Sequence, residues 1–209
     1  FVSLGYGDIN EPIAKNKMKE VSIPIAYSYG YNRAEPYNDY KSSDEIIKTM
    51  VKTIAKGDNF LLAVGAMADG TLPMITEQKL REISKWMVKN REAILDADSY
   101  TPEAPFWTIN PKAGENILFT RNDKYTYVIL TDWSTDLLNL KNFKIGDYST
   151  ATSVNTGEKL EIDFNKTSFV ISLPKERNKK VFIVRIESID EKVKKEKEKK
   201  AKKVKKEKP

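Results

Sequence analysis

The chain has 209 residues, of which 40% are hydrophobic and 32% are charged, and it contains no histidine and no cysteine. It is therefore long enough for one or two globular domains, and within these residues it excludes disulfides, cysteine or Ser-His nucleophiles and the usual zinc sites. The net charge of +6 comes from residues 190–209, which hold eleven lysines and five acidic residues, so the rest of the chain is neutral and nucleic acid is not an expected partner. No uncharged apolar run approaches the ~20 residues that span a bilayer, so we expect no membrane helix. We also expect no cofactor and no metal.

The first part of the chain predicts strands and then a helix. Residues 1–4 and 21–26 are short apolar runs followed by glycine or polar residues, which is typical of strands that lead into loops. Ser42 or Ser43 can cap a helix that follows, because acidic residues occupy its first turn. Its apolar residues form one stripe at helical spacing: Ile46, Ile47, Met50, Val51 and Ile54.

A further strand and a second helix come next. The apolar run 59–65 predicts a strand that is covered on both faces, and 67–73 predicts a loop. Thr76 is expected to cap the second helix, whose inward side carries Leu80, Ile83, Met87 and Ile94. This order of strand and helix is typical of a βα-barrel or a doubly wound parallel sheet.

The pattern changes after residue 97. Residues 100–105 contain two prolines and predict an extended connector. Short alternating runs separated by turn residues follow, without a helical stripe, and they predict an antiparallel β-sandwich. We therefore expect an α/β part at 1–97, a β-sandwich at 98–189 and a lysine- and glutamate-rich disordered tail at 190–209. The predicted strand runs are 106–109, 116–121, 124–131, 137–145, 149–154, 159–164, 168–173 and 180–188.

Five motifs occur in a fixed order along the first part of the chain. They are GDINEP at 7–12, KEVSIPI at 19–25, SYGYN at 28–32, GDNFLLAVGAMADG at 57–70 and WMVKNREAI at 86–94. Together they resemble the C-terminal half of the α-L-fucosidases of glycoside hydrolase family 29. Each motif is weak alone, but the ordered set is specific, and the resemblance covers about residues 1–188.

The resemblance implies the C-terminal part of a (β/α)8-type barrel followed by a β-sandwich. It also implies a retaining hydrolysis of terminal α-L-fucose on glycans, in which one carboxylate attacks the anomeric carbon and another carboxyl group acts as acid and then base. The family's nucleophilic Asp and fucose-binding histidines lie on earlier barrel strands. Because the chain begins at Phe1, we expect it to be a piece of a longer protein that completes its barrel with the N-terminal remainder. We expect this piece to be inactive alone, because one carboxylate of the catalytic pair is absent.

Glu11 and Glu20 are alternative candidates for the general acid/base. Both lie in the loop-rich opening segment, and catalytic groups of a barrel lie on loops at the carboxyl ends of its strands. Family members differ over which of these two positions supplies the group. Each residue taken singly could also be an ordinary solvated glutamate.

Aromatic residues near the second motif are candidates for binding the sugar. Tyr29 and Tyr31 could stack on a sugar face, with Gly30 allowing close backbone approach, although Tyr31 could instead close the barrel end. Asp69 is expected to shape a turn rather than to catalyse. The tryptophans are expected to pack in the core or between domains: Trp86, Trp107 and Trp133.

The chain departs from the family's motifs at several positions, and other functions compete with catalysis. Lys19 replaces a tryptophan, Ala63 replaces an asparagine and Ala66 replaces a proline, so a divergent or inactive member is an alternative. A second hypothesis is a non-catalytic carbohydrate-binding or adhesion module built on the sandwich, and a third is an interaction protein that works through the lysine tail. The sequence determines neither oligomeric state nor compartment, since both secreted and cytoplasmic locations fit.

Overall fold

The computed structural model describes residues 2–4, 19–101, 117–133, 136–141, 150–165, 168–175 and 180–187. Contacts divide the chain into two units, 1–100 with 178–181, and 101–177 with 182–209. Glu11, Trp107, the predicted strand 106–109 and the tail at 190–209 lie outside the described residues.

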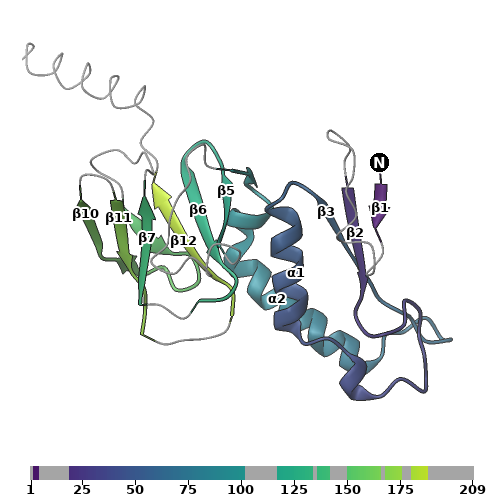
Figure 1. Ribbon diagram of the computed structural model, residues 1–209. Helices are drawn as coiled ribbons and strands as arrows, with labels where there is room; N and C mark the ends of the chain where they lie inside the picture. The colour runs from purple at the N-terminus through teal and green to yellow at the C-terminus, as the bar shows by residue number, and fades with distance from the viewer. Residues whose placement is uncertain are drawn as a thin grey trace, which may run out of the picture. The chain divides into compact units, whose positions relative to one another are not determined.

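The first unit contains a parallel sheet. Strands β1 (Val2–Leu4), β2 (Lys19–Pro24) and β3 (Asn59–Ala63) run in the order β1-β2-β3, and both neighbouring pairs are parallel. Helices α1 (Ser43–Ile54) and α2 (Met74–Ile94) follow β2 and β3 in the chain, and Figure 1 shows them together on one side of the sheet. The predicted parallel pairing is confirmed. The unit also holds a 3-10 helix, Tyr37–Asp39, and the short strand β4, Asp98–Ser99.

Alternating side chains explain how this sheet binds its helices. Val21 and Ile23 of β2 are buried, and Ile25 continues their face. Ile25 packs with Ala26 and with Ile46 of α1, which is fully buried. Partly buried side chains from the loop, β3 and α2 close around this cluster: Tyr40, Phe60, Leu62, Leu80 and Ile83.

The opposite face of the sheet carries the intervening residues of the same strands. Glu20 lies beside Asn59, and Ser22 lies beside Leu61, whose exposed fraction is 47%. The prediction that strand 59–65 is covered on both faces is therefore wrong for the part of the chain that the structure describes. The run is apolar throughout, but its helices cover only the face of Phe60 and Leu62.

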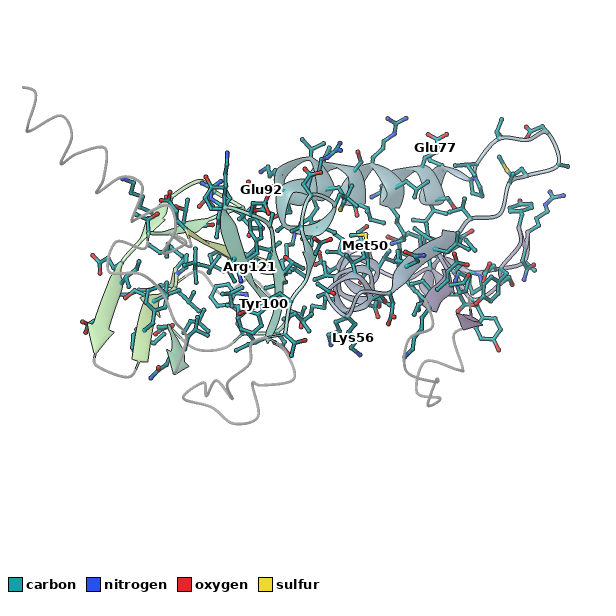
Figure 2. All side chains as sticks on the ribbon, turned by 90° about the horizontal axis from the view of Figure 1, so that it is seen from above. Met50, Lys56, Glu77, Glu92, Tyr100 and Arg121 are labelled. Carbon is teal, nitrogen blue, oxygen red and sulfur yellow. The ribbon has the colours of Figure 1, made fainter. Side chains whose placement is uncertain are left out.

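The two helices begin in different ways. At α1, Ser42 and Glu45 form a capping box: the backbone N–H of Glu45 donates to Ser42 Oγ (3.2 Å), and the backbone N–H of Ser42 donates to Glu45 Oε2 (2.8 Å). Helix α2 begins at Met74, after Pro73, so the prediction that Thr76 caps it is wrong. Thr76 is instead buried within the first turn. Figure 2 shows Met50 of α1 between the helices and Glu77 of α2 on the outer side.

The second unit is built from antiparallel strands. One set runs in the order β5 (Ile117–Arg121), β6 (Tyr125–Leu130), β12 (Phe182–Glu187), β8 (Ala151–Ser153) and β9 (Lys159–Leu160). A second sheet has the order β10 (Ile162–Asn165), β11 (Ser168–Ser172) and β7 (Leu137–Lys141). All these pairs are antiparallel, as the alternating pattern predicted.

The interior of the second unit is apolar. Fully buried side chains come from both sheets and include Tyr127, Ile129, Leu140, Ile171 and Ile183. Trp133 is also buried, and its ring packs against Phe182 with a centroid distance of 5.1 Å. The predicted core position of Trp133 is confirmed. Of the helices that the structure describes, none has the length and apolarity needed to cross a bilayer.

Candidate active site

The carboxyl edge of the parallel sheet is the place where the loops of the first unit gather. Strand β2 ends at Pro24 and β3 ends at Ala63, and the ladder continues by one bond from the Ile25 N–H to the Ala63 carbonyl (3.0 Å). Residues 26–41, which we name the tyrosine loop, leave this edge from β2, and residues 64–73 leave it from β3. Active sites of α/β proteins lie at this edge because loops from several strands converge there.

The tyrosine loop presents four tyrosines to solvent. Tyr27 is the most exposed, at 83%, and the others are Tyr29, Tyr31 and Tyr37. Tyr29 is also tethered, because its hydroxyl donates a hydrogen bond to the carbonyl of Ser22 in β2 (3.0 Å). The two predicted sugar-binding residues, Tyr29 and Tyr31, therefore lie on one loop at the carboxyl edge.

Charged side chains fix the backbone of the tyrosine loop from within. The N–H of Ser28 donates to Glu35 Oε1 (2.8 Å), and Lys41 Nζ donates to the carbonyl of Ala26 (2.8 Å). Burial lowers the pKa of Lys41, while the nearby carboxylates of Glu45 and Glu35 act in the opposite direction. The start and the end of the loop are thus joined through side chains to its own main chain.

The segment after β3 contains a turn shaped by Asp69. Its Oδ1 accepts hydrogen bonds from the Thr71 N–H (3.0 Å) and from Thr71 Oγ1 (2.8 Å), and these bonds lower the pKa of Asp69. Gly70 completes the turn with a φ of 85°, in the region that favours glycine. The predicted turn-shaping role of Asp69 is confirmed.

The tyrosine loop and the segment 64–73 approach one another through main-chain atoms. A Cβ atom placed on Gly65 would lie 2.1 Å from the nitrogen of Tyr31 and 2.5 Å from the carbonyl carbon of Gly30. No side chain fits between these loops at that point.

The two candidate acid/base residues differ in where they fall relative to this edge. Glu20 is the second residue of β2, beside Ser3 of β1 and Asn59, the first residue of β3, so it lies at the amino end of the sheet. Pro24 lies four positions further along the strand, which is ~13 Å at the rise of an extended strand. Glu11 belongs to the sequence between β1 and β2 and lies outside the described residues. Which glutamate acts stays a prediction.

Sequence reasoning missed Glu35, Lys41 and Gly65. Gly65 lies in the motif 57–70, which could have drawn attention to it. No sequence motif points to Glu35 or Lys41, because their hydrogen bonds depend on how the tyrosine loop folds back on itself. Trp86 is half-buried on α2, and its Nε1 has no hydrogen-bond partner within the described part of the chain. Among the same described residues, no group of three acidic side chains could hold a metal.

Comparison with known proteins finds α-L-fucosidases among the relatives of this chain. The family model for α-L-fucosidase matches residues 8–92. Human plasma α-L-fucosidase is 31% identical over 115 residues, covering 52% of this chain and 22% of the human protein. The α-L-fucosidase of Dictyostelium discoideum is 46% identical over 70 residues, covering 34% of this chain and 15% of that protein. The match therefore spans less than a quarter of these relatives.

Solved structures of α-L-fucosidases share the fold over most of the chain. One is 25% identical with a TM-score of 0.70 and covers 89% of this chain and 42% of its own. The Thermotoga maritima α-fucosidase in complex with fucose, at 23% identity and a TM-score of 0.66, covers 88% and 42% and extends the likeness in fold. Ordered motifs, the family model and the curated relatives agree with this likeness: residues 8–92 match the α-L-fucosidase family, and the chain is similar in sequence and fold to members of that family.

Proposed function

We propose that these residues belong to a retaining glycosidase that removes terminal α-L-fucose from glycans. The observation that carries this proposal is the family match over 8–92, which includes both candidate glutamates and the whole tyrosine loop. The chain would supply the last strands of a (β/α)8-type barrel, and the nucleophilic carboxylate would come from barrel strands in the N-terminal remainder. On this proposal the chain 1–209 alone does not hydrolyse fucosides.

Glu11 is the proposed general acid/base. It follows β1 in the sequence, and the connection after a barrel strand lies at the catalytic edge. Glu20 is disfavoured because it lies at the amino end of β2. In the first step the nucleophile would bond to the anomeric carbon while Glu11 protonates the departing glycosidic oxygen. In the second step Glu11, now a carboxylate, would take a proton from the water that displaces the nucleophile.

Tyr29 and Tyr31 are the proposed sugar-binding residues. A tyrosine ring offers an apolar face to the C–H groups of a sugar and a hydroxyl to its polar groups. The bond from Tyr29 to Ser22 holds its ring in place before substrate arrives, which lowers the entropy lost on binding. The roughly half-exposed state of both rings leaves surface available for a ligand.

The alternative of a carbohydrate-binding module on the sandwich lacks support from the second unit. Among its described residues, Leu137 is the large hydrophobic side chain that is exposed, and no aromatic residue is exposed there. A stacking platform for sugars needs such aromatic surface. The exposed tyrosines lie in the first unit.

The experiment compares Glu11→Gln and Glu20→Gln in the full-length protein. Loss of a general acid slows catalysis by roughly 10²–10⁴-fold, so Glu11→Gln should lower kcat by that factor on a fucosylated oligosaccharide. The loss of kcat in Glu11→Gln should be smaller on an aryl fucoside, whose leaving group needs little protonation. Azide should restore turnover by this variant, because azide can replace water as the nucleophile of the second step without a general base. Glu20→Gln should stay within a few-fold of the parent. A large loss confined to Glu20→Gln would refute the assignment of Glu11, and hydrolysis by the chain 1–209 alone would refute the proposed source of the nucleophile.

A further inference from the structure

The glycine at position 65 is required by space and not by backbone conformation. The glycines with positive φ among the described residues are Gly57, Gly70 and Gly157, and Gly65 is not one of them. An alanine could therefore adopt its backbone angles, but its Cβ would lie 2.1 Å from the nitrogen of Tyr31, where ordinary contacts begin at 3.4 Å. The tyrosine loop or β3 would have to move by more than 1 Å.

The atoms in the way belong to main chain, so they cannot swing aside as a side-chain tip does. They are the backbone atoms of Gly30 and Tyr31, between Ser28 and Glu35 of the tyrosine loop. That loop is held on both sides of these residues, by Ser28 N–H to Glu35 and by Lys41 to the carbonyl of Ala26. A methyl group at position 65 would thus displace the segment that carries Tyr29 and Tyr31, while these bonds hold the residues around it.

We propose that Gly65 and Glu35 are positioning residues that set where the tyrosine loop presents Tyr29 and Tyr31 to the sugar. Gly65 fixes the distance of the loop from β3 by direct backbone contact. Glu35 fixes its curvature, because its half-buried carboxylate accepts the Ser28 N–H across seven residues. This inference rests on the proposed function, since it treats the loop as part of a fucoside site.

The first test is Gly65→Ala in the full-length protein, with hydrolysis of an aryl fucoside as the assay. A displacement of about 1 Å in binding groups can cost as much as 10²-fold, so we expect KM to rise at least tenfold. The change in kcat should be smaller, because stacking acts on the substrate and transition state alike. The matched control is Gly70→Ala on the same loop: its Cβ meets open space, but its φ of 85° strains an alanine. Gly70→Ala should therefore lower thermal stability without changing KM.

The second test needs no enzymatic activity. Trypsin cleaves after Arg33, an exposed residue of the tyrosine loop, and mass spectrometry gives the rate of that cleavage. We expect faster cleavage in Gly65→Ala than in the parent and in Gly30→Ala, since a Cβ at position 30 meets nothing within 4 Å. Cleavage that is accelerated in a protein without fucosidase activity would support the positioning role while refuting the proposed function.

Glu35 provides an independent pair of variants if Gly65→Ala does not fold. Glu35→Ala removes the acceptor for the Ser28 N–H and should raise both KM and the rate of cleavage after Arg33. Glu35→Gln keeps an acceptor oxygen and should restore most of both values. If Gly65→Ala folds and leaves both KM and the rate of cleavage after Arg33 unchanged, the proposal is overturned. If Gly65→Ala does not fold, the same result in Glu35→Ala overturns it.

Discussion

At the first turn of α1, Ser42 and Glu45 satisfy one another's backbone N–H groups. Bonds from the Ser42 side chain and backbone to the Glu45 carboxylate lower the pKa of Glu45 below its ordinary 4.5. A carboxyl whose pKa is lowered on folding stabilises the folded state above the unfolded pKa, and this contribution disappears as pH falls through the lowered value. The cap is therefore a pH-dependent contribution to the stability of the first unit.

We predict that Ser42→Ala lowers the free energy of unfolding by about 1 kcal/mol at pH 7. The difference from the parent should shrink on acidification from pH 5 towards pH 3, as Glu45 becomes protonated in both proteins. Urea unfolding at a series of pH values measures it. Thr49→Ala serves as the control, because Thr49 bonds to the Glu45 carbonyl inside the same helix and not at its cap. A difference that does not vary with pH would contradict the role of the carboxylate.

The sequence could locate residues of this kind only where the partner is close along the chain. Ser42 and Glu45 are three residues apart, and Asp69 and Thr71 are two apart, so their pairings follow from helix and turn geometry. The pairing of Glu35 with Ser28 crosses a loop whose path no periodicity specifies. For the same reason the steric role of Gly65 becomes visible only when the two loops are placed side by side.

At the scale of elements, the helices and the sheet depend on one apolar contact surface. Ile46 of α1 is fully buried against Ile25 and Ala26, which follow β2. The same two-residue alternation that directs Val21 and Ile23 to this surface leaves Ser22 and Leu61 on the other face. The spacing of apolar residues therefore determined which faces meet.

Ile46→Ala should destabilise the first unit by roughly 2–5 kcal/mol, because it leaves a cavity in a site with no solvent access. Val88→Ala on α2 is the comparison, since Val88 is 79% exposed and should change stability by less than about 0.5 kcal/mol. Denaturant unfolding of both variants gives the two values. Equal effects would mean that the α1 surface is not the core of this unit.

Element types were predictable, while element starts and strand coverage were not. The stripes of both helices and the alternation of the later strands carry a clear period, so parallel and antiparallel sheets followed from it. Thr76 was the predicted N-cap of α2 because threonine is a good capping residue. In the structure Pro73 occupies the N-cap position, and Thr76 is buried. The position of Glu20 at the amino end of β2 required the strand register, which the motif does not contain.

At the scale of the whole molecule, charge is segregated along the chain. The last twenty residues, 190–209, account for the entire net charge of +6, and the preceding 189 residues carry 25 basic and 25 acidic groups. Attraction between such a segment and a polyanion is long-ranged and falls steeply with salt. The preceding 189 residues contribute no net charge to this attraction.

A chain that ends at residue 189 should lose retention on a cation exchanger at pH 7 and low salt, whereas the chain 1–209 should bind and elute as salt rises. On the proposed function, the same deletion in the full-length protein should leave fucoside hydrolysis unchanged, which separates the tail from the proposed active site. Equal retention of the two proteins would show that a basic patch within residues 1–189, not the tail, provides the charge that binds the resin.

The opposite placement of Glu20 and the tyrosine loop along β2 has a practical consequence for engineering. The apolar residues that determine how β2 and β3 align lie within the strands, while the loop from Ala26 to Lys41 begins beyond them. A library that randomises Tyr27, Tyr29, Tyr31 and Tyr37 while retaining Glu35 and Gly65 should therefore yield mostly folded variants. On the proposed function, selection from such a library would change which sugars bind without renewed optimisation of the scaffold.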